Sequence, residues 1–424
     1  MAREFLLSRR DLLRAGAAVA LAACGDNLDP EALTGPAYAA TFDVDATGAV
    51  IAVAAPRAAV AAAVVVDRAT GDVVAMPTGA IGPGGTARLD VTGLAPDRAY
   101  AYTVRCDDGT GSGDFVFATP PAGPRPVRIA YSADIDLDPQ FASPIFQTLA
   151  AADHDLFVSI GDWPYADNPP GAITLAEYRA RHAAVRTPDI IQRWLATTSV
   201  RAIYDDHEVK NDWDPRVPAA RVDAAMQAWD EWFPIRGAVG DVRYRRFGWG
   251  PLVECFLLDC RRYRSDSTAP DGPDKTMLGA TQLAWFLDGI TTSAAPFKLV
   301  FTSVPLAYGY VVEHWGVYTF ERDRMLAAIR DAGVTGVLFL TADQHWFAAH
   351  ALPSGAREFQ VGPLARGMPE LPPSEPGVLV QIRTYNFGVV EIAPGEPPTL
   401  TFRAHDATGA LLYEESFTPA ALRL

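Results

Sequence analysis

The chain has 424 residues, 49% of them hydrophobic, and a formal net charge of −15 at pH 7. This much apolar material can bury at least one large core, and the length predicts two or three globular domains. No nucleic-acid partner is expected, because binding to phosphate backbones needs clustered Lys and Arg, and the 36 basic residues form no such cluster in the sequence. The acidic excess fits either a solvated surface or carboxylates gathered around cations.

Residues 1–24 are expected to be an export signal rather than part of the fold. Arg9 and Arg10 precede a weakly apolar stretch that is too short to span a bilayer, and Cys24 ends the sequence Leu-Ala-Ala-Cys. The pattern resembles a twin-arginine lipoprotein signal, in which Cys24 becomes the lipidated first residue. A general secretory signal with ordinary cleavage is the alternative. We therefore expect an exported protein, periplasmic or at the cell surface, held at a membrane only through a lipid anchor.

Residues 25–36 are predicted to be a linker, and residues 37–121 a small all-β sandwich. Short β-branched runs alternate with turn sequences such as Gly-Pro-Gly-Gly at 82–85. The segment around Tyr100 resembles the corner of a fibronectin type III-like domain, in which a tyrosine hydroxyl bonds to the backbone. The proline-rich stretch that follows indicates a connection to a second domain, residues 126–424.

From residue 126 onward, apolar strands alternate with helical stretches, which predicts an α/β core. We expect helices over 144–152, 174–186, 280–290 and 320–332. Five strands end in acidic residues, namely Asp134, Asp162, Asp205 with Asp206 and His207, Asp259, and Asp343 with His345. In open α/β sheets, ligands bind outside the carboxyl ends of the strands, so these side chains are expected to converge on one region.

Several carboxylates in one place repel one another and take up protons unless cations neutralise them. Aspartate together with neutral histidine suits zinc, manganese or iron, whereas calcium favours oxygen ligands. Capping of the next helix is the better explanation for any single aspartate. Capping does not explain the Asp-His pair at 206–207 or the Asp-x-His at 343–345, so the sequence predicts a metal site. Asp162 would then bridge two metals, with Tyr165 as a phenolate ligand.

Six ordered segments resemble the PhoD-type alkaline phosphatases of the calcineurin-like metallophosphatase superfamily. They are GDWPYAD, YDDHEVKNDW, FLLDCRRYRS, MLGATQLAWFLDGI, FTSVPL and LTADQHWFAAH. The similarity covers residues 126–420, and the sandwich matches the usual N-terminal domain of that family. The resemblance implies an α/β metallophosphatase core of two packed mixed sheets flanked by helices. It places His207 beside the scissile phosphate and implies the metal ligands Asp134, Asp162, Tyr165, Asp206, Asn211, Asp343 and His345.

The chain departs from the family pattern at three places. The first motif has Ala133 where the family commonly has a cysteine, which puts cysteine-bound iron in doubt. Glu313 stands where a metal-binding aspartate is usual, so Glu313 is a further candidate ligand and His314 an extra one. The usual glycine before the last motif is Ala342, which is expected only to tighten packing. The resemblance implies two or more metal ions, either calcium with iron, or zinc or manganese.

The predicted function is that of a metal-dependent phosphoester hydrolase resembling alkaline phosphatase D. Two cations lower the pKa of a bridging water, and the resulting hydroxide attacks a phosphomonoester in line. His207 donates a hydrogen bond or proton to the leaving oxygen. Arg261 and Arg264 are candidates to clamp the phosphate as forked donors. Structural ion pairs with Asp259 or Asp266 explain these two arginines at least as well.

Two other functions remain open from the sequence. The same hydroxide serves a phosphodiesterase or phospholipase D-like activity on a small-molecule or lipid phosphoester. The aromatic residues that either wall in a large leaving group or pack inside the protein are Trp163, Tyr178, Trp213 and Trp232. A catalytically degenerate surface binding lipoprotein would account for the departures at Ala133 and Glu313. Metal content distinguishes this last alternative from an enzyme.

Overall fold

The computed structural model of the chain describes residues 35–137, 143–237, 240, 242–310 and 313–424. The expected export signal, with Arg9, Arg10 and Cys24, lies outside the described residues. The chain divides into two compact units. The first comprises residues up to 121 together with 186–200 and 230–237, and the second comprises 122–185, 201–229 and 238–424.

The N-terminal part of the first unit is all β. Its strands are β1 (Gly35–Pro36), β2 (Tyr38–Phe42), β3 (Gly48–Ala54), β4 (Val60–Asp67), β5 (Val73–Ala75), β6 (Thr78–Ala80), β7 (Thr86–Thr92), β8 (Ala99–Cys106), β9 (Thr110–Gly111) and β10 (Phe115–Ala118). Antiparallel pairs join β4 to β8 and join β3 to both β2 and β7. The Tyr100 hydroxyl accepts a hydrogen bond from the Ala95 amide at 2.9 Å, which ties the turn before β8 to that strand. Later in the sequence, α4 (Asp189–Leu195) also belongs to this unit.

One sheet of the second unit has the strand order β23-β22-β21-β11-β12, with β13, of which residues 201–203 belong to this unit, next to β12. Their bounds are β11 (Val127–Ser132), β12 (Leu156–Ile160), β13 (Ser199–Ile203), β21 (Asn386–Ala393), β22 (Thr399–Asp406) and β23 (Leu411–Phe417). β11 and β12 run parallel, and every residue of β12 is buried. A continuous apolar run of this kind is typical of a parallel strand that is covered on both faces.

The other sheet has the strand order β14-β15-β16-β17-β19-β18-β20. Their bounds are β14 (Arg245–Gly248), β15 (Val253–Leu258), β16 (Phe297–Thr302), β17 (Val337–Thr341), β18 (Phe347–Ala351), β19 (Arg357–Gln360) and β20 (Val378–Ile382). Aromatic rings pack between the two sheets. The Tyr131 ring of β11 lies 5.7 Å from that of Phe301 of β16, and Phe402 of β22 stacks on Phe359 of β19 at 3.9 Å. The core of the second unit therefore lies between two packed mixed sheets.

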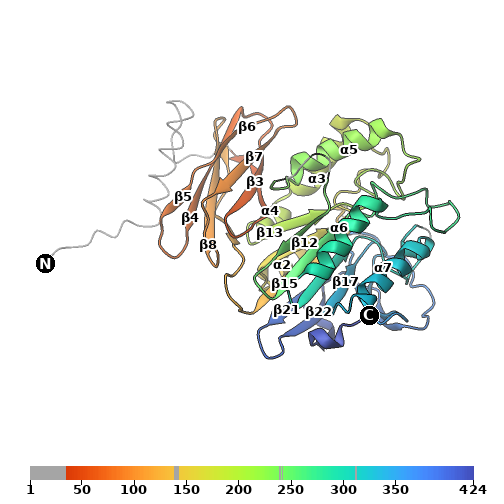
Figure 1. Cartoon of the computed structure of the whole chain (residues 1–424). Helices are drawn as coiled ribbons and strands as arrows, with labels where there is room; N and C mark the ends of the chain where they lie inside the picture. The colour runs from red at the N-terminus through yellow and green to blue at the C-terminus, as the bar shows by residue number, and fades with distance from the viewer. Residues whose placement is uncertain (1–34, 138–142, 238–239, 241, 311–312) are drawn as a thin grey trace. The chain divides into compact units, whose positions relative to one another are not determined.

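The four expected helices are confirmed as α2 (Ile145–Ala151), α3 (Leu175–Arg186), α6 (Gly279–Thr292) and α7 (Thr319–Asp331). The structure adds α4 and α5 (Ala219–Trp232), and the short turns η2 (Trp315–Val317) and η3 (Pro419–Ala421). α6 and α7 lie across β15 and β17 (Figure 1), where Phe286 and Ile329 join one buried cluster with Phe256 and Phe339. None of the described helices combines the length and the apolar character that crossing a membrane requires.

Candidate metal centre

Three groups of side chains in the second unit could each hold a metal ion, with ligand atoms within 4.8 Å of one another. The groups are Asp134 with Asp162 and His345, Asp162 with Asp206 and His207, and Asp162 with Asp205, Asp206 and Asp343. These residues follow the ends of β11, β12, β13 and β17. Asp162 belongs to all three groups, which is the position that a carboxylate bridging two cations needs.

The backbone at these strand ends adopts a left-handed conformation that residues other than glycine rarely adopt. The residues concerned are Asp134, Asp162, Asp343 and His345, with φ of 64°, 58°, 76° and 64°. Such residues cost about 1–3 kcal/mol each and persist only where the surrounding structure determines them. Gly161, at φ 115°, allows the close approach of the next strand, because a Cβ atom there would lie 2.4 Å from that of Asp205. Backbone strain is thus concentrated where the acidic side chains meet.

The carboxylates fit a metal site because several of their oxygens are buried without a hydrogen-bond partner among the described residues. Within the described part of the chain, both oxygens of Asp134, Oδ2 of Asp162 and Oδ1 of Asp206 are buried without a hydrogen-bond partner. Burial, followed by neighbouring carboxylates, raises the pKa of Asp134, Asp162 and Asp343 well above the usual value. Buried anions without partners are costly, and bound cations remove that cost. The residues present therefore suit a multivalent metal cluster.

Tyr165 and His345 meet at this cluster, with the tyrosine hydroxyl 2.8 Å from Nε2 of the histidine. Nδ1 of His345 donates to the carbonyl of Gly367 at 2.5 Å, which leaves the lone pair on Nε2. That atom lies 3.8 Å from Oδ1 of Asp134. Burial lowers the pKa of His345 to about 4, so the ring is neutral near pH 7. A neutral imidazole beside a phenol and a carboxylate is a suitable metal ligand.

His207 is held by a carboxylate that the sequence interpretation did not assign. Its Nδ1 lies 2.7 Å from Oδ1 of Asp167, and the other oxygen of Asp167 accepts a hydrogen bond from the backbone N–H of Asn211 at 2.8 Å. Burial works to lower the pKa of His207, but Asp206 and Asp167 raise it to about 9. The imidazole is therefore a cation at neutral pH. In the sequence, the only signal for this role of Asp167 was its place as the second carboxylate in residues 161–167, the stretch that also contains Tyr165.

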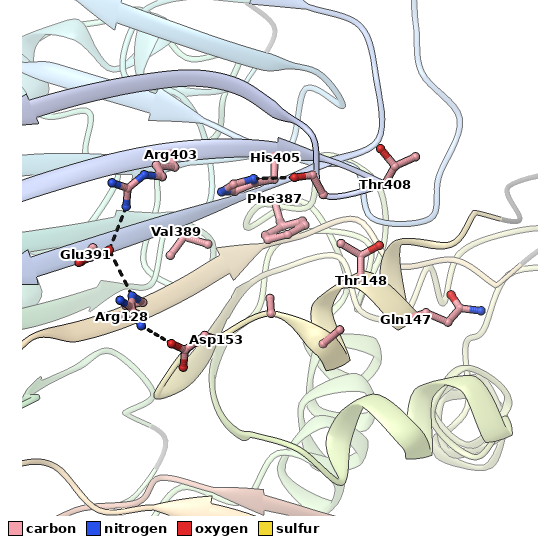
Figure 2. A pocket seen from close by; sticks show the side chains of 13 residues that line it. Arg128, Gln147, Thr148, Asp153, Phe387, Val389, Glu391, Arg403, His405 and Thr408 are labelled. Carbon is pink, nitrogen blue, oxygen red and sulfur yellow. Dashed lines mark hydrogen bonds and ion pairs between the residues drawn. The ribbon is translucent and has the colours of Figure 1, made fainter.

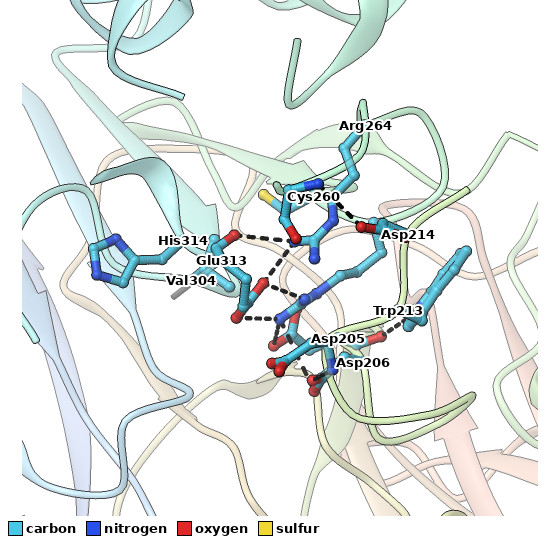
Figure 3. Close-up of polar contacts among 12 residues, drawn as sticks. Asp205, Asp206, Trp213, Asp214, Cys260, Arg264, Val304, Glu313 and His314 are labelled. Atoms are coloured by element: carbon cyan, nitrogen blue, oxygen red, sulfur yellow. Dashed lines mark hydrogen bonds and ion pairs between the residues drawn. The ribbon is translucent and has the colours of Figure 1, made fainter. Parts of the chain in front are cut away.

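Arg261, a candidate phosphate clamp, is wholly buried among carboxylates: it bonds to Asp205 and Glu313, and Asp206 and Asp343 each lie 3.9 Å from its Nη2. Its Nε and Nη2 donate to Asp205 at 2.5 and 2.7 Å, and its Nη2 also donates to Glu313 at 3.0 Å. Arg264 donates to Glu313 at 2.6 Å, and Figure 3 shows Glu313 and Arg264 converging on the same place as Asp205 and Asp206. Both arginine side chains are 0% exposed. The structure therefore makes Glu313 a counter-ion of two arginines and leaves it outside the candidate metal groups.

Other residues singled out in the sequence lie around the centre or apart from it. Asn211 is exposed, and its backbone N–H donates a hydrogen bond to Asp167. Asp259 accepts the Tyr204 hydroxyl and belongs to no candidate group in the described residues. His314 is buried and accepts the Gly316 amide at 2.9 Å. The aromatic residues considered as cavity walls are at most 3% exposed and so pack inside the protein, namely Trp163, Tyr178, Trp213 and Trp232.

Sequence comparison finds similarity to phosphatases. The model of the family "PhoD-like phosphatase" matches residues 139–391, which are more than half of the chain. Alkaline phosphatase D of Bacillus subtilis (strain 168) is 24% identical over 309 residues, which are 61% of this chain and 53% of that protein. The chain thus spans about half the length of this curated relative.

Two solved structures share the fold over most of the chain. "Structure of PhoD" superposes with a TM-score of 0.80 at 19% identity, covering 94% of this chain and 92% of that one. A purple acid phosphatase isolated from yellow lupin (Lupinus luteus) seeds superposes with a TM-score of 0.68 at 12% identity, covering 92% and 75%. The second unit therefore has a metallophosphatase fold, as expected from the sequence.

Proposed function

We propose that this chain, which belongs to the PhoD-like phosphatase family, hydrolyses phosphoesters with the help of bound metal ions. The observation that carries the proposal is the sharing of Asp162 by three groups of candidate ligands, next to buried carboxylate oxygens that have no partner in the described residues. Phosphate esters are anions, so a site that gathers cations can both bind them and stabilise the charge that develops during hydrolysis.

Two or more metal ions would be held by Asp134, Asp162, Tyr165, Asp206, Asp343 and His345, with Asn211 as a further candidate ligand. When bound, they supply the Lewis acidity that activates water and neutralises the phosphoryl oxygens. Asp205 also lies within ligand distance, but both of its oxygens accept hydrogen bonds from Arg261. An oxygen-rich set with histidine suits calcium, manganese, zinc or iron.

His207 acts on the leaving group in this proposal. Its Nδ1 is occupied by Asp167, so Nε2 carries the proton that can be donated to the leaving oxygen. The ring belongs to a candidate metal group with Asp162 and Asp206, and its amide donates to Oδ1 of Asp162 at 3.3 Å. These contacts hold the imidazole beside the carboxylates at the centre. Asp167 is accordingly a positioning residue, because it orients His207 and keeps it protonated.

The proposed substrates are small-molecule phosphomonoesters, and a phosphodiesterase or phospholipase D-like activity on the same site is the alternative. Export remains a proposal that rests on Arg9, Arg10 and the lipidation candidate Cys24, all in the sequence before the described residues. In the same way, two or more resident ions per chain is a proposal supported by the candidate groups.

The test combines elemental analysis of the purified protein with a panel of aryl phosphates and bis-aryl phosphates. We expect at least two metal ions per chain and faster turnover of the monoesters. Asp162→Ala should lose metal and at least about a hundredfold in turnover while keeping its circular dichroism spectrum. The control is Asp323→Ala, which removes an exposed carboxylate on α7. Full activity of Asp162→Ala, or a metal-free and inactive wild-type protein, would overturn the proposal.

A further inference from the structure

A cavity of about 500 Å³ lies next to the candidate metal centre in the second unit. It is lined by Lys210, Asn211, Asp212, Asp214, Arg216, Val217, Pro218 and Arg221. Two of its residues are bonded directly to carboxylates of the centre. The backbone N–H of Asp212 donates to Asp206 at 2.5 Å, and the backbone N–H of Asn211 donates to Asp167 at 2.8 Å. The backbone of residues 211–212 therefore joins the cavity lining to Asp206 of the candidate metal groups and to Asp167, which holds His207.

The cavity contains positive charge that the protein itself does not neutralise. Arg216 is paired with Asp214 at 2.6 Å and with Asp266 at 3.4 Å. Lys210 and Arg221, by contrast, have no carboxylate within ion-pair distance in the described part of the chain. Apart from the Arg216–Asp214 pair, the lining has these two cations and one anion, the carboxylate of Asp212. The lining is thus left with a net charge of about one positive unit.

Arg221 is fixed in place by neutral groups. Its Nε donates to the Tyr178 hydroxyl at 2.9 Å, and that hydroxyl donates to the carbonyl of Val209 at 2.8 Å. Tyr178 is itself fully buried. A guanidinium oriented by a buried phenol keeps donors available for a ligand, because a single acceptor occupies only one of its five N–H groups. The side chain is therefore arranged before any anion binds.

Lys210 is unusual in this sequence. The chain has three lysines, and the other two, Lys275 and Lys298, are 5% and 7% exposed. Lys210 is exposed, in a protein whose formal net charge is −15. Positive charge at this cavity is therefore a local feature and not part of a generally basic surface. Without these cations, the negative charge of the rest of the protein would repel an anion from this cavity.

A second cavity, of about 590 Å³, shows what a neutralised lining looks like (Figure 2). Its arginines Arg128 and Arg403 both bond to Glu391, at 3.2 and 2.9 Å. Arg128 also pairs with Asp153, and Arg403 pairs with Glu414 at 2.6 Å. Because the cations there already have partners, that cavity indicates no ligand. The cavity at Lys210 lacks this compensation.

We propose that the cavity lined by Lys210 and Arg221 binds an anionic group carried by the leaving group of the substrate. This inference rests on the proposed hydrolase function and narrows its substrate class. The preferred substrates are phosphoesters whose alcohol part bears a second negative group, a carboxylate or a further phosphate. Lys210 contributes a mobile ammonium and Arg221 a fixed guanidinium, a pair that suits either anion.

The test uses three aryl phosphates of closely similar leaving-group acidity. Their phenols carry a para carboxyethyl, propyl or aminoethyl group, so that the distal charge is negative, zero or positive. We expect kcat/KM to fall in that order, with the difference mainly in KM. In Lys210→Gln and Arg221→Gln the ratio of the anionic to the neutral substrate should drop roughly three- to tenfold, as expected for partly exposed ionic contacts. Lys210→Arg should restore most of the ratio.

The control variant is Arg330→Gln, which removes a half-exposed arginine on α7 that is paired with Asp331. It should leave the ratio unchanged. A para phosphonoethyl phenol distinguishes the two anions, because a larger preference for the phosphonate indicates a second phosphate in the natural substrate. Equal kcat/KM across the charge series in the wild-type protein would contradict the inference. An equal loss of kcat/KM on all three substrates in Lys210→Gln would also contradict it. Failure of the proposed function is a different result, namely no turnover of any substrate.

Discussion

His207 is held between Asp167 and Tyr165, with Nδ1 2.7 Å from the Asp167 carboxylate and its ring 4.1 Å from that of Tyr165, centroid to centroid. The contact joins the loop after β12 to the end of β13, so neither segment can move without displacing the imidazole. Because Asp206 and Asp167 raise the pKa of His207 to about 9 against the effect of burial, the histidine is a proton donor at neutral and mildly alkaline pH.

Asp167→Asn is expected to shift the alkaline limb of the pH–rate profile. Protonated His207 is the active form in our proposal, so the rate falls as pH rises through its pKa. Removing the Asp167 carboxylate lowers that pKa, and the limb should move to lower pH by roughly one pH unit. The measurement is kcat/KM between pH 6 and about pH 10, with Asp323→Asn as the control. An unchanged limb with reduced activity throughout would assign Asp167 a purely structural role.

Glu313→Gln is expected to destabilise the fold while metal content stays unchanged. The variant leaves Arg261 and Arg264 buried with one fewer anion, and breaking a buried pair costs about 3–5 kcal/mol. The pKa of Glu313 is lowered by these two arginines against the effect of burial. Its contribution is therefore present above the ordinary pKa of 4.5 and is lost as pH falls further. Urea unfolding and elemental analysis provide the two readouts, and metal loss at unchanged stability would identify Glu313 as a ligand.

Removal of the metals is expected to destabilise the protein more at pH 8 than at pH 5. Without cations, burial raises the pKa of Asp134, Asp162 and Asp343, so the folded state binds more protons than the unfolded chain. Stability of the metal-free protein then falls as pH rises above the ordinary pKa of these groups, and bound cations relieve this cost. Melting temperatures with and without a chelator at the two pH values measure the effect. An equal loss at both would contradict the predicted carboxylate crowding.

Gly362→Ala is expected to reduce metal content through Asp134. The residue has φ 98°, and a Cβ atom there would lie 2.2 Å from Oδ2 of Asp134. The control is Gly93→Ala, at φ 82° with nothing within 4 Å of the added atom. Both variants incur backbone strain of about 1 kcal/mol or more. Only Gly362→Ala should also displace the side chain of Asp134, a candidate metal ligand. Thermal unfolding measures the loss of stability in both variants, and elemental analysis shows whether metal is lost as well.

Local patterns in the sequence were sufficient for much of the fold. Helical periodicity and apolar runs predicted α2, α3, α6, α7 and the strands β11, β12, β13, β15 and β17, because these signals depend on neighbours within a few residues. Acids at the ends of separate strands predicted that Asp134, Asp162, Asp206 and His345 would meet, since parallel strands present their carboxyl ends at one edge. The membership of segments 186–200 and 230–237 in the first unit had no comparable local signal.

The roles of individual charged residues were decided only by the tertiary structure. Arg261 and Glu313 both suited a phosphate or metal site by type and position, yet they neutralise each other in the interior, together with Asp205. Asp167 was visible in the sequence, but its contact with His207 spans 40 residues. Residue type determines which bonds a side chain can make. Which of those bonds form depends on what the fold brings within about 3 Å, and long-range packing sets that distance.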